Sequence, residues 1–544
     1  MRSRTSLTAW FALVAAGLAM VISILVAVNH NDSPTDAATI FEKVSPSVVF
    51  IQQPDGSSGS GVLLEDGWIV TNYHVTYPLE AVRVTFPDGT EIEEAPVAYW
   101  DPVSDIALLG PIESSEPTMA LSDSSAVDIG STVYLIGYPG ELEDFPQPAI
   151  TGGVLSRRRS VDDLGVVFLQ TDALIAGGQS GGALVDARGH LIGISGLGSF
   201  TEANFALVED AAAVALRTAA LRDGDTIDET FRPPDDAVTA DEFEIELSST
   251  GGPIAFYMSV PEGDDIPIPV EISASTDGPD ICVSVTNGQG GPVGDLPATC
   301  FDDLDYTIER SGAAAESSGG SQDEIVYTEV DLRDFANEAG LSMEQVTGGD
   351  LLEWEFYEVE VRALVDDGVL TETQLDDFLA AQNANFLTDA DSDVELVGEV
   401  DGAGMYVVSI WNVSGEPGTL EVTSNFALTP APDSDSGSVS AGDKVMGVLD
   451  FPGDMDHFDL DTSGDDPITL RVDGLFDTFL WVLDGDGTVV AEEDDSNLGL
   501  YGTSTEMRFE PDNNGPYTVV VRSFAPEVAA GYALTVGPNL QFHK

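Results

Sequence analysis

The sequence predicts a mostly β chain that is divided into several domains, and three observations lead to this fold class. From residue 37 to residue 222, short β-type runs alternate with Gly, Pro and Asp turns, which is typical of an all-β barrel or sandwich. From residue 241 to residue 538, runs with two-residue alternation indicate two further β-sandwich domains. A chain of 544 residues is also too long for a single hydrophobic core.

Residues 1–30 carry the features of an export signal. Arg2 and Arg4 precede an apolar stretch, residues 9–28, in which Ser23 is the only polar residue. About 20 apolar residues can span a bilayer as a helix, whereas the core of a cleaved signal peptide has about 7–15. The length favours an uncleaved signal-anchor, and a cleaved signal peptide is the alternative. Either way, the rest of the chain is expected outside the cytoplasm, membrane-anchored or secreted.

Acidic residues far outnumber basic ones, with 96 Asp and Glu against 19 Lys and Arg. The formal net charge of −77 at pH 7 would repel nucleic-acid phosphates and anionic lipid headgroups. We therefore expect no nucleic-acid partner, and membrane contact only through the N-terminal segment. The charge is interpreted as a means of keeping the protein soluble rather than as a ligand site.

The first β-rich domain, residues 37–222, is expected to have a helix at each end. Asp36 can cap the run AATIFEKV, and Asp210 can cap the run AAAVALRTAALR, which stops at an Asp-Gly pair. Residues 223–240 follow; they are acidic, contain two consecutive prolines and lack periodicity, which predicts an extended linker.

The two β-sandwich domains are predicted over residues 241–428 and 443–538, with a polar linker at 429–442. GMYVVSI, which begins at Gly404, and GPYTVVV, which begins at Gly515, share one alternating pattern. We interpret this pattern as an internal duplication.

The first of these sandwiches has two further features. Residues from about 332 to 387 include runs such as DLLEWEFYEVEVRALVDDG and ETQLDDFLAAQNANF, and are interpreted as a helical insertion. Cys282 and Cys300 are the only cysteines of the chain. In an exported protein this pair predicts a disulfide, and two buried thiols are the alternative.

Three separate motifs supply the groups needed for nucleophilic acyl transfer. TNYHV contains His74, SDIALL contains Asp105, and GGQSGGALVD contains Ser180. A serine hydroxyl needs a neutral imidazole to take its proton, and the imidazole needs a carboxylate that fixes its tautomer. The glycines near the serine would let the backbone N–H groups of Gly178 and Ser180 converge on a developing oxyanion. The motifs therefore predict a catalytic triad with an oxyanion hole.

On these motifs, with FEKVSPSVVFIQ and NFALVEDAAAVA, residues 37–222 resemble the trypsin-like serine proteases, and among them the HtrA/Deg type. The resemblance implies a chymotrypsin-like domain of two β-barrels that share one cleft. It also implies His74 as general base, Asp105 as its orienting partner and Ser180 as nucleophile.

The sequence departs from that type in two respects. Gly177 and Gln179 stand where Pro and Asn are common, and we expect both changes to be tolerated because backbone amides carry the chemistry. No PDZ-like segment follows residue 222, so activation by C-terminal tails is not implied.

The substrate pocket is expected to have its base near Leu174, with Ser195 and Gly196 in its wall. No acidic residue at position 174 would pair with Lys or Arg. The hypothesis is cleavage after small or medium aliphatic residues.

Residues 443–538 resemble the bacterial pre-peptidase C-terminal (PPC) domains, on the run DMDHFDLDTSGDDPITLRVDGLFDTFLWVLDGDGTVVAEEDD and on GPYTVVVRS. Asp477, Asp484 and Asp486 in this run are candidate calcium ligands, because calcium takes six to eight oxygen atoms. A plain hairpin with solvated acidic side chains is the favoured alternative. No other cofactor is expected, and the chain has no HExxH motif for zinc.

Two functions remain open from the sequence. The first is an exported serine endopeptidase that hydrolyses peptide bonds in proteins or peptides. The second is a catalytically inactive surface protein that binds through its β-sandwiches. The retention of all three triad residue types favours the first, since relics usually lose them.

Overall fold

The computed structural model describes the following residues, and all structural statements refer to them: 36–140, 146–198, 206–223, 238–247, 253–261, 267–288, 290–291, 293–294, 296, 326–328, 355–357, 392–400, 402–412, 417–433, 436–462, 467–485, 487–493, 504–511, 515–523 and 529–538. The chain divides into two compact units, Met1–Asp228 and Glu229–Lys544.

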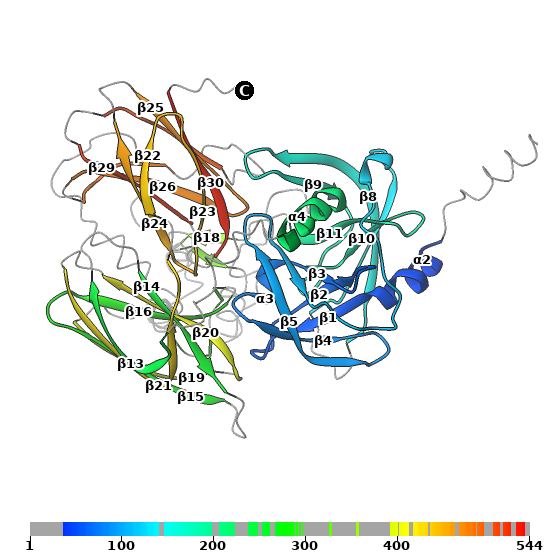
Figure 1. Ribbon diagram of the computed structural model, residues 1–544, viewed down its shortest axis with the longest axis horizontal. Helices are drawn as coiled ribbons and strands as arrows, with labels where there is room; N and C mark the ends of the chain where they lie inside the picture. Colours follow the sequence, from blue (N-terminus) through cyan, green and yellow to red (C-terminus); the bar gives the residue numbers. More distant parts are fainter. Residues whose placement is uncertain are drawn as a thin grey trace, which may run out of the picture. The chain divides into compact units, whose positions relative to one another are not determined.

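The first unit contains two closed, six-stranded β-barrels, drawn in blue and in cyan to green (Figure 1). The first barrel has the strand order β1 (Val48–Gln52), β2 (Ser58–Leu63), β3 (Ile69–Thr71), β6 (Ile106–Leu109), β5 (Glu91–Asp101) and β4 (Ala81–Thr85). The second has the order β10 (Ala183–Asp186), β11 (Leu191–Gly198), β12 (Ala206–Asp210), β9 (Val166–Thr171), β8 (Ala149–Val161) and β7 (Thr132–Gly137). All neighbouring strands in the two barrels are antiparallel. The mostly β fold and the two barrels are confirmed.

Helices lie at both ends of this domain, each capped as the sequence predicts. Asp36 accepts a hydrogen bond from the N–H of Thr39 (3.0 Å) at the start of α2 (Ala37–Val44). Asp210 accepts from the N–H of Ala212 (2.8 Å) at the start of α4 (Ala211–Asp223). Three short helices complete the unit: η1 (Ser45–Ser47), α3 (Tyr73–Thr76) and η2 (Ser124–Ala126).

One apolar cluster joins the two barrels and both long helices. It contains Val48 and Val62 of the first barrel, Ile136 of the second, Ile40 of α2 and Val214 of α4. All of these side chains are essentially inaccessible to solvent. Because protein interiors are close-packed, this shared core fixes the two barrels against each other.

The second unit begins with a seven-stranded antiparallel sheet. Its strands are β13 (Ala240–Leu247), β14 (Ile254–Val260), β15 (Ile268–Thr276), β16 (Ile281–Asn287), β19 (Asp393–Val400), β20 (Gly404–Asn412) and β21 (Gly418–Pro430). A small sheet pairs β17 (Val326–Thr328) with β18 (Glu355–Tyr357). The prediction of helix at 355–357 is therefore wrong, because the backbone there pairs as a strand with residues 326–328. The rest of the predicted helical insertion lies outside the described residues.

The C-terminal part contains two more sheets that share one hydrophobic core. The five-stranded sheet has the order β22 (Ser436–Ser440), β24 (Met455–Asp461), β29 (Tyr517–Ser523), β26 (Thr478–Leu483) and β27 (Val489–Glu493). The four-stranded sheet has the order β23 (Lys444–Val448), β30 (Gly531–Pro538), β25 (Ile468–Gly474) and β28 (Ser504–Phe509).

Residues 429–430 and 436–440 of the segment predicted as a linker at 429–442 are strand, which corrects that expectation for these residues. Strand β21 continues to Pro430, and β22 pairs in parallel with β24. A separate apolar cluster also joins the two parts of the second unit: Cys282, Trp411, Met455, Trp481, Leu483 and Val520. The polar composition of this segment did not reveal that its backbone completes a sheet. Residues 224–237 of the other predicted linker lie outside the described residues.

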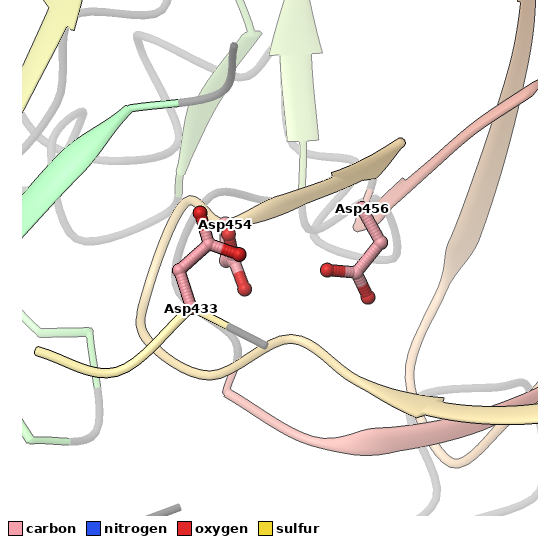
Figure 2. A group of neighbouring side chains, drawn as sticks. All are labelled: Asp433, Asp454 and Asp456. Carbon is pink, nitrogen blue, oxygen red and sulfur yellow. The ribbon is translucent and has the colours of Figure 1, made fainter. Parts of the chain in front are cut away.

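Acidic side chains gather between β21 and β24 in the second unit. Asp433, Asp454 and Asp456 bring carboxylate oxygens within 4.8 Å of one another, and their side chains face each other in Figure 2. Asp454 and Asp456 are buried, whereas Asp433 is exposed. Burial, and then the charges of Asp433 and Asp450, raise the pKa of Asp454 well above its ordinary value.

Candidate active site

Helix α3 carries His74 at the end of β3, and neighbouring side chains hold this single turn. Gln53 donates from Nε2 to the carbonyl of Val75 (2.8 Å), and Trp100 donates from Nε1 to the hydroxyl of Thr76 (2.9 Å). The ring of Trp100 also packs edge-on against Tyr73. A turn this short has no stability of its own, so tertiary contacts determine the place of His74.

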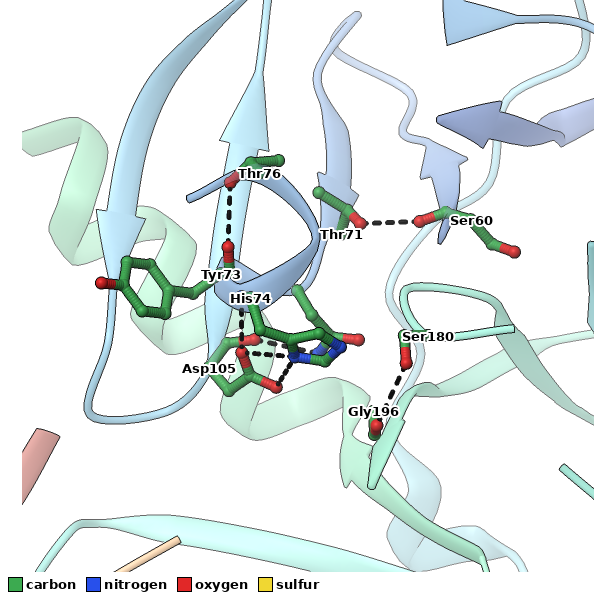
Figure 3. Close-up of polar contacts among 9 residues, drawn as sticks. Ser60, Thr71, Tyr73, His74, Thr76, Asp105, Ser180 and Gly196 are labelled. Atoms are coloured by element: carbon green, nitrogen blue, oxygen red, sulfur yellow. Dashed lines mark hydrogen bonds and ion pairs between the residues drawn. The ribbon is translucent and has the colours of Figure 1, made fainter. Parts of the chain in front are cut away.

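Asp105 lies just before β6 and binds His74 through its carboxylate. The imidazole Nδ1 is 2.8 Å from Oδ2 and 3.0 Å from Oδ1, and the backbone N–H of His74 donates to Oδ1 (3.0 Å; Figure 3). These contacts require the hydrogen on Nδ1, which leaves Nε2 as the basic nitrogen of the neutral ring. His74 and Asp105, which the sequence predicts as general base and orienting partner, are thus in direct contact, and their catalytic roles remain a prediction.

The backbone of Asp105 is held in a left-handed conformation with φ 55°. Its carbonyl accepts hydrogen bonds from the N–H of Tyr73 (3.1 Å) and from Nδ2 of Asn72 (2.9 Å). Aspartate tolerates this region better than most residues, and strain of this kind often occurs at functional sites.

Two opposing influences act on the titration of His74. Burial favours the neutral ring, whereas the charge of Asp105 and the hydrogen bond to it favour the protonated ring. The result is a pKa raised above the ordinary value of 6.5. The side chain keeps 34% of its surface exposed, so the ring remains open to solvent on one side.

The nucleophile loop, residues 177–181, is held by its carbonyl groups. The Gly177 carbonyl accepts from the N–H of Gly140 (2.6 Å), and the Gln179 carbonyl accepts from the hydroxyl of Ser195 (2.5 Å) and the N–H of Gly182 (3.0 Å). In a trans peptide the N–H points opposite to the carbonyl. The N–H groups of Gly178 and Ser180 therefore both point away from these anchors.

Those two N–H groups donate to no atom of the described residues. Gly178 has φ 84°, and a Cβ there would lie 2.6 Å from the nitrogen of Gly140 and 2.8 Å from the carbonyl oxygen of Tyr138. Only glycine fits this conformation and this space. The geometry leaves both N–H groups without an acceptor among the described residues, and the oxyanion hole predicted for Gly178 and Ser180 remains a prediction.

The hydroxyl of Ser180 donates to the carbonyl of Gly196 (3.2 Å). Figure 3 shows Ser180 on the side toward which the imidazole of His74 extends. The described contacts of Ser180 thus include the Gly196 carbonyl, and the predicted proton transfer to His74 requires the Ser180 hydroxyl to give up this hydrogen bond.

The three residues predicted for the substrate pocket lie in different surroundings. The side chain of Leu174 is 69% exposed, and its carbonyl accepts from the hydroxyl of Thr151 (2.7 Å). Ser195 is buried and its hydroxyl is used within the nucleophile loop. A Cβ on Gly196 would lie 2.9 Å from Nδ2 of Asn72. The pocket remains a prediction, in which Ser195 could take part only through its backbone.

Motif reasoning missed a buried acidic residue behind the site. Glu209 on β12 is 3% exposed, and neither carboxylate oxygen has a hydrogen-bond partner among the described residues. Burial, followed by the charge of Asp101, raises the pKa of Glu209 well above its ordinary value. Asp101 itself binds Arg217 (3.3 Å). Glu209 is in a β-type run that gives no signal of this charge cluster.

Of the predicted calcium ligands, the described Asp477 and Asp484 do not belong to the acidic group of Figure 2. Asp484 accepts from the N–H of Thr488 (3.0 Å) in a hairpin turn, as the hairpin alternative expects. Asp486 lies outside the described residues. Cys282 is disulfide-bonded, and Cys300, the other cysteine of the chain, also lies outside them.

Comparison with known proteins gives a match in the first unit. Residues 59–194 match the trypsin-like peptidase domain family. The chain is 38% identical over 192 residues to "Serine protease HTRA2, mitochondrial" of Bos taurus, which covers 32% of this chain and 41% of the relative. It is 37% identical over 142 residues to "Probable periplasmic serine endoprotease DegP-like" of Halomonas elongata, covering 26% and 29% respectively. The first unit contains a trypsin-like peptidase domain of the HtrA/DegP type.

This HtrA-type domain accounts for part of the chain only, and the chain spans less than half the length of these curated relatives. Among solved structures, "HtrA-type protease AlgW with tripeptide" is 30% identical, with a TM-score of 0.31, over 35% of this chain and 65% of that one. The PPC resemblance of residues 443–538 remains a prediction. Within the described ranges no helix is long and apolar enough to cross a membrane, and the predicted signal segment, residues 1–30, is not among them.

Proposed function

We propose that this protein is an exported serine endopeptidase that hydrolyses peptide bonds in proteins or peptides through an acyl-enzyme. The observation that carries the proposal is the His74–Asp105 pair, bound at 2.8 Å, beside a loop whose Gly178 and Ser180 N–H groups point away from their anchors. Homology to HtrA-type serine proteases supports the same reaction class.

In the proposed acylation, Ser180 Oγ attacks the scissile carbonyl carbon while its proton passes to Nε2 of His74. Asp105 keeps the other ring proton on Nδ1 and stabilises the imidazolium that forms. The carbonyl oxygen becomes an oxyanion, which accepts hydrogen bonds from the N–H groups of Gly178 and Ser180. His74 then gives its proton to the leaving amine, the C–N bond breaks, and the acyl group stays on Ser180.

Deacylation repeats these steps with water as the nucleophile. His74 takes a proton from the water, the second oxyanion occupies the same pair of N–H groups, and Ser180 recovers its proton as the carboxylic acid leaves. The Ser180 hydroxyl must first give up its hydrogen bond to the Gly196 carbonyl. Side-chain rearrangements of this size take picoseconds to nanoseconds, far less than the time of a typical enzyme turnover.

The proposed setting is outside the cytoplasm, because residues 1–30 have the composition of an export signal. The proposed substrates are polypeptides cleaved after small or medium aliphatic residues. Profiling with a peptide library would test the second point, and a strong preference for Arg or Lys would contradict it.

The decisive experiment compares wild type with Ser180→Ala in the full chain. We expect loss of peptide hydrolysis to background and loss of covalent labelling by a fluorophosphonate probe. Ser160→Ala, which changes an exposed serine of the second barrel, is the matched control and should keep both properties. A wild-type protein that neither hydrolyses peptides nor reacts with the probe would favour the inactive surface protein that acts through its sheets.

A further inference from the structure

Ser60 lies in β2 of the first barrel, is fully buried, and binds the nucleophile loop of the second barrel at two points. Its N–H donates to the carbonyl of Ser180 (2.7 Å). Its hydroxyl donates to the carbonyl of Gly178 (2.8 Å) and accepts from the N–H of Tyr138 (2.8 Å). The hydroxyl is thus used both as donor and as acceptor, in a place that solvent does not reach.

Ser60 also connects this loop to the strand that leads to His74. Its carbonyl accepts from the hydroxyl of Thr71 (2.6 Å), the last residue of β3, as Figure 3 shows. Asn72 follows directly and donates to Asp105. A single residue therefore bonds to the loop of the nucleophile and to the strand that ends next to the general base.

The Ser60 hydroxyl acts on one of the two peptide planes that flank Gly178. The plane before it is held by Gly140, which binds the Gly177 carbonyl. The plane after it is held at its carbonyl by Ser60 and at its N–H by the carbonyl of Ala176, to which Gln179 donates (3.1 Å). Within the described residues no other group donates to the Gly178 carbonyl. Because glycine can rotate more freely than any other residue, an anchor on both sides is needed to keep its N–H aimed in one direction.

We propose that the Ser60 hydroxyl is a positioning group for the oxyanion hole, acting through the Gly178 carbonyl. The inference rests on the proposed peptidase function. Ser60 reaches no reacting atom; it keeps the Gly178 N–H directed at the place where negative charge develops. An interaction of this kind is stronger in the transition state than in the substrate complex, so it raises kcat and leaves KM unchanged.

The test uses the full chain with Ser60→Ala and a fluorogenic peptide taken from the library that wild type cleaves. Loss of one oxyanion donor costs about 10²–10³-fold in rate. Misorientation of the Gly178 N–H should therefore cost less, about 10- to 100-fold in kcat. KM should stay within about twofold. A peptide boronic acid of the same sequence forms a tetrahedral adduct on Ser180, and its affinity should fall by the same factor as kcat/KM.

Ser58→Ala is the matched control, since Ser58 lies on the same strand and contributes no hydrogen bond to the loop in the described residues. It should behave as wild type in all three measurements. Ser60→Cys fills the space of the hydroxyl with a somewhat larger thiol that is only a weak donor, so the same selective loss of kcat and boronate affinity is expected from it. This second variant carries the test if Ser60→Ala does not fold.

Wild-type kcat and boronate affinity in Ser60→Cys, or in folded Ser60→Ala, would overturn the inference. Equal losses in substrate binding and turnover would also overturn it, because they indicate general disruption. These results are distinct from failure of the proposed function, in which wild type itself is inactive or Ser180→Ala remains active.

Discussion

Asp105 binds His74 both through the imidazole and through the backbone, since its carboxylate lies 2.8 Å from Nδ1 and 3.0 Å from the amide nitrogen. The same carboxylate thus fixes the position of the chain at residue 74 and the rotation of the ring. Any change at Asp105 alters the geometry and the proton affinity of the base together.

Replacement of Asp105 by Asn should lower kcat by about 10⁴-fold, because the amide no longer selects the tautomer with hydrogen on Nδ1. Asp105 raises the pKa of His74, and only the neutral ring accepts a proton from Ser180. The acid limb of kcat/KM should therefore lie above pH 6.5 in wild type and shift to lower pH in the variant. Asp128→Asn, at an exposed site in the turn before β7, is the control, and an unshifted acid limb in Asp105→Asn would contradict the prediction.

Gly178→Ala should reduce kcat by at least about 10²-fold. The φ of 84° and the close approach of Gly140 leave no room for a Cβ, so the loop must move and the oxyanion N–H is displaced. Gly177→Ala provides a matched comparison, because a Cβ at that position has no atom within 4 Å. Steady-state kinetics of the two variants test the point, and equal activity would show that this N–H does not serve the reaction.

Glu209→Gln should stabilise the first unit at neutral pH, with an effect that grows as pH rises. The raised pKa means that the folded protein keeps the Glu209 proton to higher pH than the unfolded chain, so wild type loses stability above the unfolded pKa of about 4.3. The difference in the free energy of unfolding between Glu209→Gln and wild type should grow by up to about 1.4 kcal/mol per pH unit until the pKa of Glu209 in the folded protein is reached. It should vanish below about pH 4.

Pulse proteolysis across a urea series, in a Ser180→Ala background that prevents self-digestion, measures this difference. Glu113→Gln is an exposed control in the same unit and should show no such trend. If the stability difference between Glu209→Gln and wild type were the same at pH 4 and pH 8, Glu209 would not be protonated in the folded protein at neutral pH.

Trp411→Ala should destabilise the second unit by about 3–5 kcal/mol, because it empties the centre of the apolar cluster that joins the two parts of that unit. Val397 is 67% exposed on β19, and Val397→Ala should have little effect. Urea unfolding of the second unit, followed by fragment patterns in pulse proteolysis, distinguishes these outcomes. Equal midpoints for Trp411→Ala and wild type would mean that this cluster adds nothing to stability.

Local features of the fold were predictable because their causes lie within a few residues. Asp36 and Asp210 cap the helices that begin directly after them, and alternating apolar residues mark the barrel strands. Prediction from the local sequence failed at 355–357, where strand pairing with distant residues overrides a pattern that suggested helix. It also failed at β22, whose polar sequence gives no sign of its parallel partner.

The sequence by itself determined a β-rich first domain, the helix caps and the motifs that hold His74, Asp105 and Ser180, since each is written in a short run of residues. The two barrels were expected only from the family resemblance that those motifs carry. Only the tertiary structure decided that Ser60 binds a carbonyl 118 residues away, and that Glu209 is buried next to Asp101 and Arg217. Such contacts depend on the register with which two closed barrels meet. The sequence around a single serine or glutamate in a strand does not predict that register.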